Sequence, residues 1–353
     1  MLVRLSAVTR LALGASFVFT SLTACTGLQP TNAVSTAGPQ GVEQYRPMIA
    51  IDGARSMLPE GFKPSALRPR WMKSPANRNE AKGRPHVAVA QFGGSSVLWF
   101  DLNDKKNKPP TTCEPASSTN GIAIDRAGNL WVPDGRTNTT TEYAPNCGSA
   151  KLTITDSTGE PADVGFDGRN RVYILNLNNV SGPPTVQFYN STNGKQLGTL
   201  SDPSFNDLFG IGTDQLGNVF VSNLTTANIG TVVEFPHGKM PGSQLSAVSL
   251  GLPGAPTFDS NNNLIITDWL RETIDVFSPP YTGSPTTAPL MGSSIWCKLN
   301  HQQIHLYCGD ADLGSIDVYA YPGNAYLYSY TASLSANGLV TGVAPAPPAA
   351  YGR

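Results

Sequence analysis

The sequence predicts an all-β protein made from one repeated unit, and three observations lead to this prediction. Only 14% of the 353 residues are charged, while 35 glycines and 29 prolines favour short strands and turns over long helices. A short β-branched and aromatic segment recurs six times, and its closing aromatic residues lie 43, 46, 46, 42 and 42 residues apart. Other strand-like segments precede each copy. Six such units are typical of a six-bladed β-propeller, in which each blade is a four-stranded antiparallel sheet.

The clearest strand of each unit begins with Ser or Thr and ends with an aromatic residue. Its copies are residues 96–100, 139–143, 185–189, 231–235, 273–277 and 315–319. A second short strand precedes each copy, at residues 87–89, 130–132, 172–174, 219–221, 264–266 and 304–306. Their β-branched and aromatic content, with turn residues between them, predicts antiparallel strands in every blade.

A third strand precedes the second one in four units, at residues 121–125, 163–167, 210–214 and 255–259. Its middle residue is always small: Ala123, Gly165, Gly212 or Thr257. A strand crowded against a central axis needs such residues, so we expect this to be the inner strand. The first unit has no inner strand of its own, and residues 342–345, with the small Ala344, are expected to supply it and close the ring. The propeller is therefore predicted to span residues 85–353.

Three stretches, GIAIDRAGNLWVPDG (121–135), GIGTDQLGNVFVSNL (210–224) and APTFDSNNNLIITDW (255–269), resemble NHL-type propeller repeats. The resemblance covers about residues 85–345 and implies a six-bladed propeller. Propellers of this kind include scaffolds, receptors, lyases and lactonases, so the resemblance leaves the function open.

The N-terminal segment predicts export. Arg4 and Arg10 precede an apolar run at residues 11–19, which is too short for a membrane span and is typical of a signal peptide. The following Leu-Thr-Ala-Cys at 22–25 resembles the lipobox of bacterial lipoproteins. The resemblance implies removal of residues 1–24 and acylation, including palmitate, of Cys25. A plain secretory signal is the alternative.

Residues 25–84 are predicted to form the lipidated cysteine and a flexible stalk. Residues 26–84 carry nine Lys or Arg against four Asp or Glu, whereas residues 85–353 carry thirteen against twenty-one. The acidic body argues against binding nucleic acid, which requires a basic surface. The basic stalk either contacts anionic lipid head groups or is simply solvated. We therefore expect a membrane-anchored protein in the periplasm or on the cell surface.

The remaining cysteines form an even set: Cys113, Cys147, Cys297 and Cys308. In an oxidising compartment we expect disulfides between Cys297 and Cys308, which flank a hairpin, and between Cys113 and Cys147 in consecutive blades. Free thiols are the alternative.

Two sets of polar residues recur in the repeat. Asp125, Asp167, Asp214 and Asp259 end inner strands and are expected to accept backbone N–H bonds in tight turns. Polar residues also end the second strands and are candidates for a ring at the central mouth: Gln91, Asp134, Asn176, Asn223 and Asp268, with Cys308 as the sixth position. Such a ring either holds a divalent cation such as calcium or caps the adjoining turns. No residue is assigned as catalytic, and no other cofactor is expected.

These observations favour a non-enzymatic binding or scaffold module of the cell envelope. It is expected to be a monomer that binds an envelope protein or glycan through the loops of one face. The alternative is a metal-dependent hydrolase or lyase of the lactonase-like propeller type, centred on the Asp/Asn ring.

Overall fold

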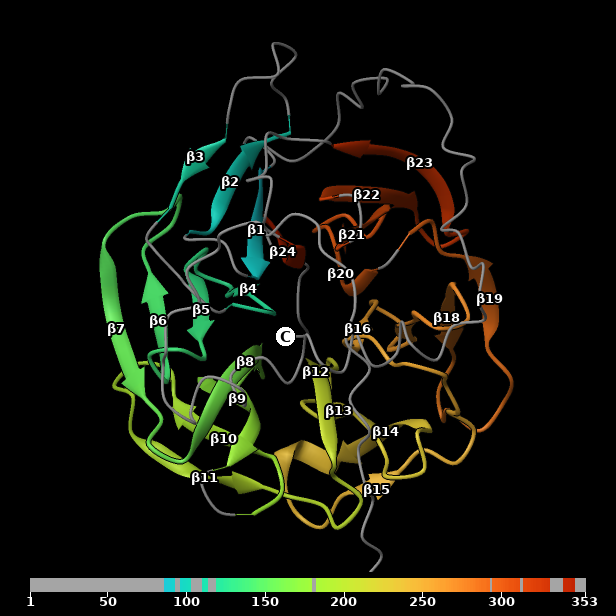
Figure 1. Cartoon of the computed structure of the whole chain (residues 1–353), viewed down its shortest axis with the longest axis horizontal. Helices are drawn as coiled ribbons and strands as arrows, with labels where there is room; N and C mark the ends of the chain where they lie inside the picture. The colour runs from blue at the N-terminus through green and yellow to red at the C-terminus, as the bar shows by residue number, and fades with distance from the viewer. Residues whose placement is uncertain are drawn as a thin grey trace, which may run out of the picture. The chain divides into compact units, whose positions relative to one another are not determined.

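The computed structural model describes residues 86–92, 96–102, 110–113, 119–179, 182–292, 294–311, 314–330 and 339–346. All of them belong to the compact unit Val42–Arg353. The predicted signal peptide, Cys25 and the stalk lie outside the described residues. The described strands form six four-stranded antiparallel sheets around a central axis, which confirms the six-bladed β-propeller (Figure 1).

We name the strands of each blade A to D from the axis outward. In that order, blade 1 contains β24 (Leu339–Ala346), β1 (His86–Phe92), β2 (Leu98–Asp101) and β3 (Thr111–Thr112). Blade 2 contains β4 (Ala123–Ile124), β5 (Leu130–Asp134), β6 (Thr139–Tyr143) and β7 (Ala150–Thr155). Blade 3 contains β8 (Gly159–Phe166), β9 (Arg171–Asn179), β10 (Thr185–Asn190) and β11 (Gln196–Leu200).

Blade 4 contains β12 (Asp207–Thr213), β13 (Val219–Leu224), β14 (Gly230–Phe235) and β15 (Ser243–Gln244), with the short 3-10 helix η3 (Pro236–Gly238) after β14. Blade 5 contains β16 (Thr257–Phe258), β17 (Leu264–Asp268), β18 (Thr273–Phe277) and β19 (Thr286–Pro289). Blade 6 contains β20 (Ser294–Leu299), β21 (His305–Asp310), β22 (Ser315–Ala320) and β23 (Ala325–Tyr330).

This order gives the propeller two distinct faces. The A-to-B and C-to-D connections of every blade lie on one face, which we call the AB face. The B-to-C connections and the D-to-A connections between blades lie on the opposite face, which we call the BC face. Because neighbouring strands are antiparallel, A strands begin and B strands end at the BC face.

The C-terminal strand closes the ring as predicted. β24 pairs antiparallel with β1, with Ala344 opposite Ala88 and Pro345 opposite Val87. The sheet therefore accommodates a proline in this strand. β24 is the inner edge of its sheet, where a residue without an N–H is tolerated.

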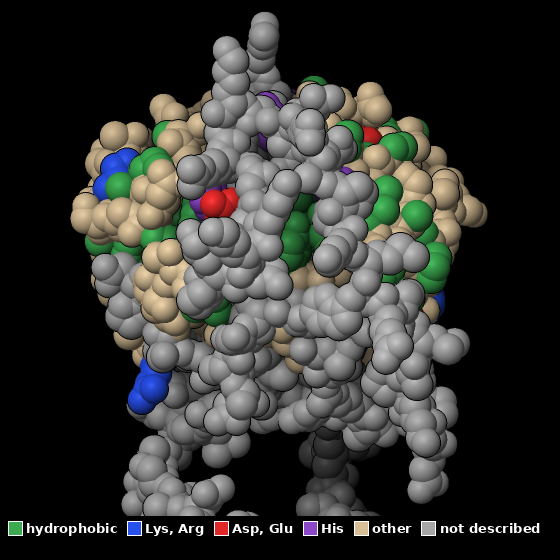
Figure 2. Space-filling view, turned by 90° about the horizontal axis from the view of Figure 1, so that it is seen from above, with side chains coloured by type: hydrophobic (Ala, Val, Ile, Leu, Met, Phe, Trp, Pro, Cys, Tyr) green, Lys and Arg blue, Asp and Glu red, His purple; other side chains and the backbone are tan. Residues whose placement is uncertain are grey.

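The hydrophobic core lies between neighbouring blades. Tyr173 and Leu175 of β9 pack with Val221 of β13 and Phe235 of β14, and similar clusters join other neighbouring blades. Burial of these β-branched and aromatic side chains is the main stabilising contribution to the fold. Seen from the side of blades 1 and 6, charged side chains are sparse among the described residues, and hydrophobic side chains are visible near the outer edge (Figure 2).

Crowding between inner strands explains one predicted small residue but not another. A Cβ at Gly212 would lie 2.4 Å from the carbonyl oxygen of Pro256 in the next blade. At Gly165 a Cβ would lie 3.6 Å from Ile211, which is an ordinary contact. The size of the side chain at position 212 is therefore limited by the A strand of the neighbouring blade and not only by the central axis.

Both predicted disulfides form, so the free-thiol alternative is wrong. Cys297 and Cys308 are directly opposite in β20 and β21, with Cα atoms 4.2 Å apart. Cys113, after β3, is bonded to Cys147 in the β6–β7 turn, with Cα atoms 5.2 Å apart, and this bond links blades 1 and 2. Two disulfides indicate an extracellular or periplasmic protein. Within the described ranges, no helix has the length and hydropathy needed to cross a membrane.

Candidate functional site

The predicted ring positions lie at the BC face, where B strands end. Strand register fixes their equivalence, because Asp134 pairs with Thr139, Asn176 with Thr185, Asn223 with Thr231 and Asp268 with Thr273. In blade 6 the residue paired with the equivalent Ser315 is Asp310, while Cys308 pairs with Asp317. The assignment of Cys308 to the ring was therefore wrong, and the sixth position is the buried Asp310.

In blades 4 and 5 the ring residues hold the D-to-A connection that precedes their own blade. The Asn223 side chain accepts from the Asn206 N–H at 2.8 Å and donates to the Ser204 carbonyl at 2.9 Å. Both carboxyl oxygens of Asp268 are bonded, one to the Gly251 N–H at 2.7 Å and the other to the Leu252 N–H at 3.1 Å. These two side chains therefore have a structural role.

Asp268 and Asp134 also accept bonds in their own B-to-C turns. Asp268 accepts from the Arg271 N–H at 3.1 Å and forms an ion pair with the Arg271 guanidinium at 3.4 Å. Half-buried Asp134 accepts from the Arg136 N–H at 3.0 Å. These contacts agree with the alternative in which the ring residues cap the adjoining turns.

In blades 1 and 3 the ring residues keep a buried polar atom without a partner. Asn176 donates to Asp156 at 2.6 Å, but its Oδ1 accepts no hydrogen bond. Gln91 is buried, and its Nε2 donates none. Buried polar atoms in native proteins nearly always have a partner, so each such atom requires an explanation.

Three more unpartnered buried atoms lie at the same face. They are Thr119 Oγ1, just before the inner strand of blade 2, and Ser294 Oγ and Trp296 Nε1 at the start of β20 in blade 6. These five atoms of the described chain comprise two N–H donors, two hydroxyls and one amide oxygen acceptor. Thr140 Oγ1 of blade 2 and Thr273 Oγ1 of blade 5 are further buried atoms without a hydrogen-bond partner near strand ends at this face.

Asp163 is the most unusual side chain near the axis, and the repeat pattern predicted no role for it. Its carboxyl is fully buried in β8 and accepts from the Val164 N–H at 2.8 Å and from the Ile211 N–H of blade 4 at 2.9 Å. A Cβ at Gly121 of blade 2 would lie 1.9 Å from Asp163 Oδ1 and 2.8 Å from Trp296 Nε1 of blade 6. The carboxyl therefore lies where four blades meet.

Burial raises the pKa of Asp163 above its ordinary value, and the positive charge of Lys298 in blade 6 opposes this shift. The two backbone N–H groups and the nearby Trp296 N–H also lower the pKa. The Trp296 indole therefore has the Asp163 carboxyl as a polar neighbour, although Nε1 meets no hydrogen-bond criterion. The repeat contained one signal of this site, because the positions equivalent to Asp163 hold Gly121, Gly210 and Ala255.

The side of the BC face formed by blades 4 and 5 is apolar. Phe209, Leu252 and Trp269 belong to a buried cluster that reaches Trp296 of blade 6. Above it, Ile229 and Leu270 in the B-to-C connections are 46% and 37% exposed. Leu270 lies against Gly251, where an added Cβ would be 2.8 Å from the Leu270 Cβ. The BC face thus exposes Ile229 and Leu270 on blades 4 and 5 and also contains buried polar atoms without a hydrogen-bond partner.

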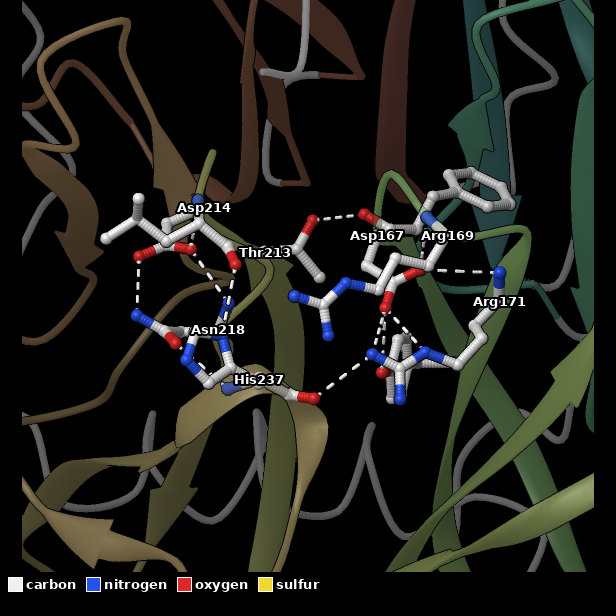
Figure 3. A network of polar contacts seen from close by, with 10 residues as sticks. Asp167, Arg169, Arg171, Thr213, Asp214, Asn218 and His237 are labelled. Atoms are coloured by element: carbon white, nitrogen blue, oxygen red, sulfur yellow. Dashed lines mark hydrogen bonds and ion pairs between the residues drawn. The ribbon is translucent and has the colours of Figure 1, made fainter. Parts of the chain in front are cut away.

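At the AB face the aspartates of the A-to-B turns are engaged within the protein, although Asn324 Oδ1 in the β22–β23 connection is buried without a hydrogen-bond partner. Each aspartate predicted to shape a turn does so, as when Asp259 accepts from the Asn261 and Asn263 N–H groups at 2.9 and 2.8 Å. Figure 3 shows the corresponding network of blades 3 and 4, where the Arg171 guanidinium binds Asp167 and donates to the His237 carbonyl at 3.0 Å. Arg171 also lies over the Tyr173 ring, 5.5 Å from its centroid.

No three His, Cys, Asp or Glu side chains in the described part of the chain gather to hold a metal ion. The divalent cation at the ring stays a prediction. His305 is the first residue of β21, and burial lowers its pKa.

Comparison with known proteins supports the fold but shows neither a family nor a function. No family model and no curated protein matches the chain. A chain from the crystal structure of a Nidogen/Laminin complex is 15% identical with a TM-score of 0.65, and the match covers 75% of this chain and 100% of that one. A protein of unknown function from Bacteroides caccae is 13% identical with a TM-score of 0.57, covering 74% and 99%.

At such identities the likeness shows the fold alone. The chain is thus similar to solved β-propellers, and its own sheets define it as a six-bladed one. The resemblance to NHL repeats and to a lipoprotein signal stays a prediction.

Proposed function

We propose that this protein is an exported, membrane-anchored binding module that captures a cell-envelope component through its BC face and performs no chemical step. The observation that carries the proposal is the set of buried polar atoms without a hydrogen-bond partner at the BC face, such as Gln91 Nε2 and Asn176 Oδ1. The same face also exposes Ile229 and Leu270, whereas the aspartates of the AB face are bonded within their turns. Unused hydrogen-bonding groups and exposed apolar side chains on a rigid scaffold are features of binding surfaces.

Further observations agree with this function. Two disulfides fit an exported protein, and lipidation of Cys25 would tether it to a membrane. Asp268 uses both carboxyl oxygens to hold a loop, which favours a binding role over a metal-dependent hydrolase at the ring. One of the similar structures is a chain from a protein complex.

The test is capture of envelope components by the immobilised full-length protein. Ile229→Asp and Leu270→Asp are expected to reduce retention of envelope material about tenfold, because each places a charge in the proposed contact. Leu216→Asp is the matched control, since Leu216 is 60% exposed in a turn of the AB face. Bound protein and bound sugar are quantified separately. Equal retention by all three variants would show that the BC face is not the binding surface.

A further inference from the structure

We propose that the AB face of blades 2, 3 and 4 docks on the surface of an anionic lipid membrane. The docking surface combines exposed cations with exposed apolar side chains, and we call it the docking patch. Its members are Arg126, Arg169, Lys195, Lys239, Leu216 and Met240. Docking through this patch is independent of capture at the BC face and acts alongside the predicted lipid anchor.

The exposed charge of the propeller is positive, although its sequence contains more acids than bases. Residues 85–353 carry thirteen Lys or Arg against twenty-one Asp or Glu. In the described part of the chain, however, every Asp and Glu is buried or half-buried. Every described Lys and Arg is exposed except half-buried Arg171 and buried Lys298. The charged side chains that an approaching surface meets first are therefore cations, which anionic lipid head groups attract.

Contacts between turns place the cations of blades 2 and 3 on one surface. A Cβ at Gly168, in the A-to-B turn of blade 3, would lie 3.2 Å from Arg126 Nη2 of blade 2. The next residue in that turn is Arg169. The C-to-D turn that carries Lys195 joins the same A-to-B turn, because the Ser191 N–H donates at 2.9 Å to the carbonyl of the residue after Arg169. These three cations therefore belong to adjoining turns.

The same surface continues onto blade 4 through His237. Its carbonyl accepts from the Arg171 guanidinium of blade 3 at 3.0 Å, and its ring Nδ1 lies 3.3 Å from the Leu216 carbonyl oxygen. Figure 3 shows this junction between the A-to-B turns of blades 3 and 4. Lys239 and Met240 follow η3 directly and are both exposed. Apolar and cationic members of the docking patch are therefore adjacent on blade 4.

The apolar members of the docking patch favour a membrane over a soluble anionic partner. Leu216 and Met240 are 60% and 54% exposed and are the two most exposed large hydrophobic side chains of the described chain. Such side chains beside cations can enter the boundary between head groups and acyl chains while the cations contact the head groups. The first described strand, β1, also begins at the AB face, so the N-terminal segment with its predicted anchor joins the propeller on this side.

The test measures binding of the unacylated protein to vesicles, because acyl chains would mask the contribution of the patch. A chain whose residues 1–25 are replaced by a plain secretory signal is mixed with vesicles of phosphatidylglycerol and phosphatidylcholine, or of phosphatidylcholine alone, and sedimented. Binding is expected only to the anionic vesicles and should fall as salt is raised. Lys239→Glu and Leu216→Asp should each weaken it at least about fivefold, since one basic residue near an anionic surface contributes about that factor and each variant adds a repelled charge.

Matched controls make the same changes at the opposite face. Arg136 and Leu270 are exposed in B-to-C connections, so Arg136→Glu and Leu270→Asp are expected to bind anionic vesicles like the parent chain. All four substitutions replace exposed side chains, so the melting temperature should change little. A short DNA duplex serves as a soluble polyanion in a parallel titration.

Two results would overturn the proposal. One is the absence of selective binding to anionic vesicles, and binding to the DNA duplex in that case would show that the cations recognise a soluble polyanion. The other is equal vesicle binding by the parent chain, Lys239→Glu and Leu216→Asp. Capture of envelope components through Ile229 and Leu270 is measured separately, so failure of membrane docking and failure of the proposed function are distinguishable.

Discussion

At the scale of single residues, one carboxyl group takes the place of a backbone carbonyl near the axis. The Gly121 N–H donates to the Ala162 carbonyl between blades 2 and 3, and the Ala255 N–H donates to the Ile295 carbonyl between blades 5 and 6. Between blades 3 and 4 a link of opposite direction is made by the Asp163 carboxyl, which accepts from the Ile211 N–H of the following blade. Asp163 therefore stabilises a blade junction, and Gly121 leaves the space that its side chain occupies.

This arrangement predicts that Gly121→Ala is destabilising. The new Cβ would lie 1.9 Å from Asp163 Oδ1 and 2.8 Å from Trp296 Nε1, so the buried carboxyl would have to move. We expect the free energy of unfolding to fall by about 1–3 kcal/mol, as for other overpacked interiors. Gly283→Ala is the control, because nothing lies within 4 Å of its added Cβ, and its effect should stay within about 0.5 kcal/mol. Urea unfolding of both variants measures the difference, and equal effects would contradict the crowding.

Asp163 also predicts a specific dependence of stability on pH. Burial raises the pKa of its carboxyl in the folded protein above the ordinary 3.8, so the folded state holds the proton more tightly than the unfolded state. The stability contributed by this group is therefore greatest below about pH 4 and falls as the pH rises through the folded pKa. Asp163→Asn does not titrate. The wild-type minus Asp163→Asn difference in unfolding free energy should decrease from pH 4 to pH 8.

The same urea titrations measure this difference at each pH. The pKa values of Asp214 and Glu234 are also raised by burial, but both groups are present in the two proteins and their contributions cancel. A difference that increases with pH would mean that interactions of the ionised carboxyl outweigh its burial.

At the scale of elements, equivalent strand ends have acquired different roles. The ring positions of blades 4 and 5 fasten the preceding D-to-A connection, while those of blades 1 and 3 leave a polar atom unpartnered. The strands themselves follow the same register in each blade. The architecture is therefore independent of what these side chains do, and a ring residue can become available for binding without loss of the blade.

The element on which closure of the ring depends is β24. It supplies the inner strand of blade 1, and Val340 and Val343 pack with Tyr307 and Ile316 of blade 6. Removal of residues 339–353 should abolish the cooperative thermal transition, because blade 1 loses its A strand and the core between blades 6 and 1 is exposed. Removal of residues 347–353 retains β24 and is the control. Calorimetry compares the two, and a cooperative transition in both would show that β24 is dispensable.

The repeat predicted the strands well, because each blade carries the same β-branched and aromatic pattern. It misplaced the sixth ring position, because the second strand of blade 6 was predicted to start at residue 304. Register pairs Leu264 with Phe277 in blade 5 and Leu306 with Tyr319 in blade 6, so the equivalent strand position is two residues later. The prediction therefore placed Cys308 where register places Asp310.

The candidate site was harder to predict, because hydrogen bonding depends on contacts between blades. Asn176 and Asn223 are the same residue type at equivalent positions, yet only Asn176 retains an unpartnered oxygen. Asp163 was visible in the sequence as an acid among small residues, but its role depends on Gly121 and Ile211 from neighbouring blades. No spacing within one unit encodes such a junction.

At the scale of the whole molecule, the chain joins the propeller on the face opposite the proposed binding surface. β1 begins at His86, and B strands begin at the AB face, whereas Ile229, Leu270 and the unpartnered atoms lie at the BC face. The first described residue of the propeller and the proposed binding surface therefore lie at opposite faces. This separation fits the proposal of a binding module that is anchored through its N-terminal segment.

The tether is the basis of the last prediction. Cys25 lies outside the described residues, and its lipidation follows from the lipobox resemblance. The mature protein should begin at Cys25, carry the mass of its acyl chains and partition into a detergent phase, because buried methylene groups each contribute about 0.8 kcal/mol to membrane binding. A chain whose residues 1–25 are replaced by a plain secretory signal should be exported, keep both disulfides and remain in the aqueous phase. Intact-mass spectrometry and detergent phase separation measure this, and an unacylated mature N-terminus in the wild type would refute the anchor while leaving the propeller and its BC face unaffected.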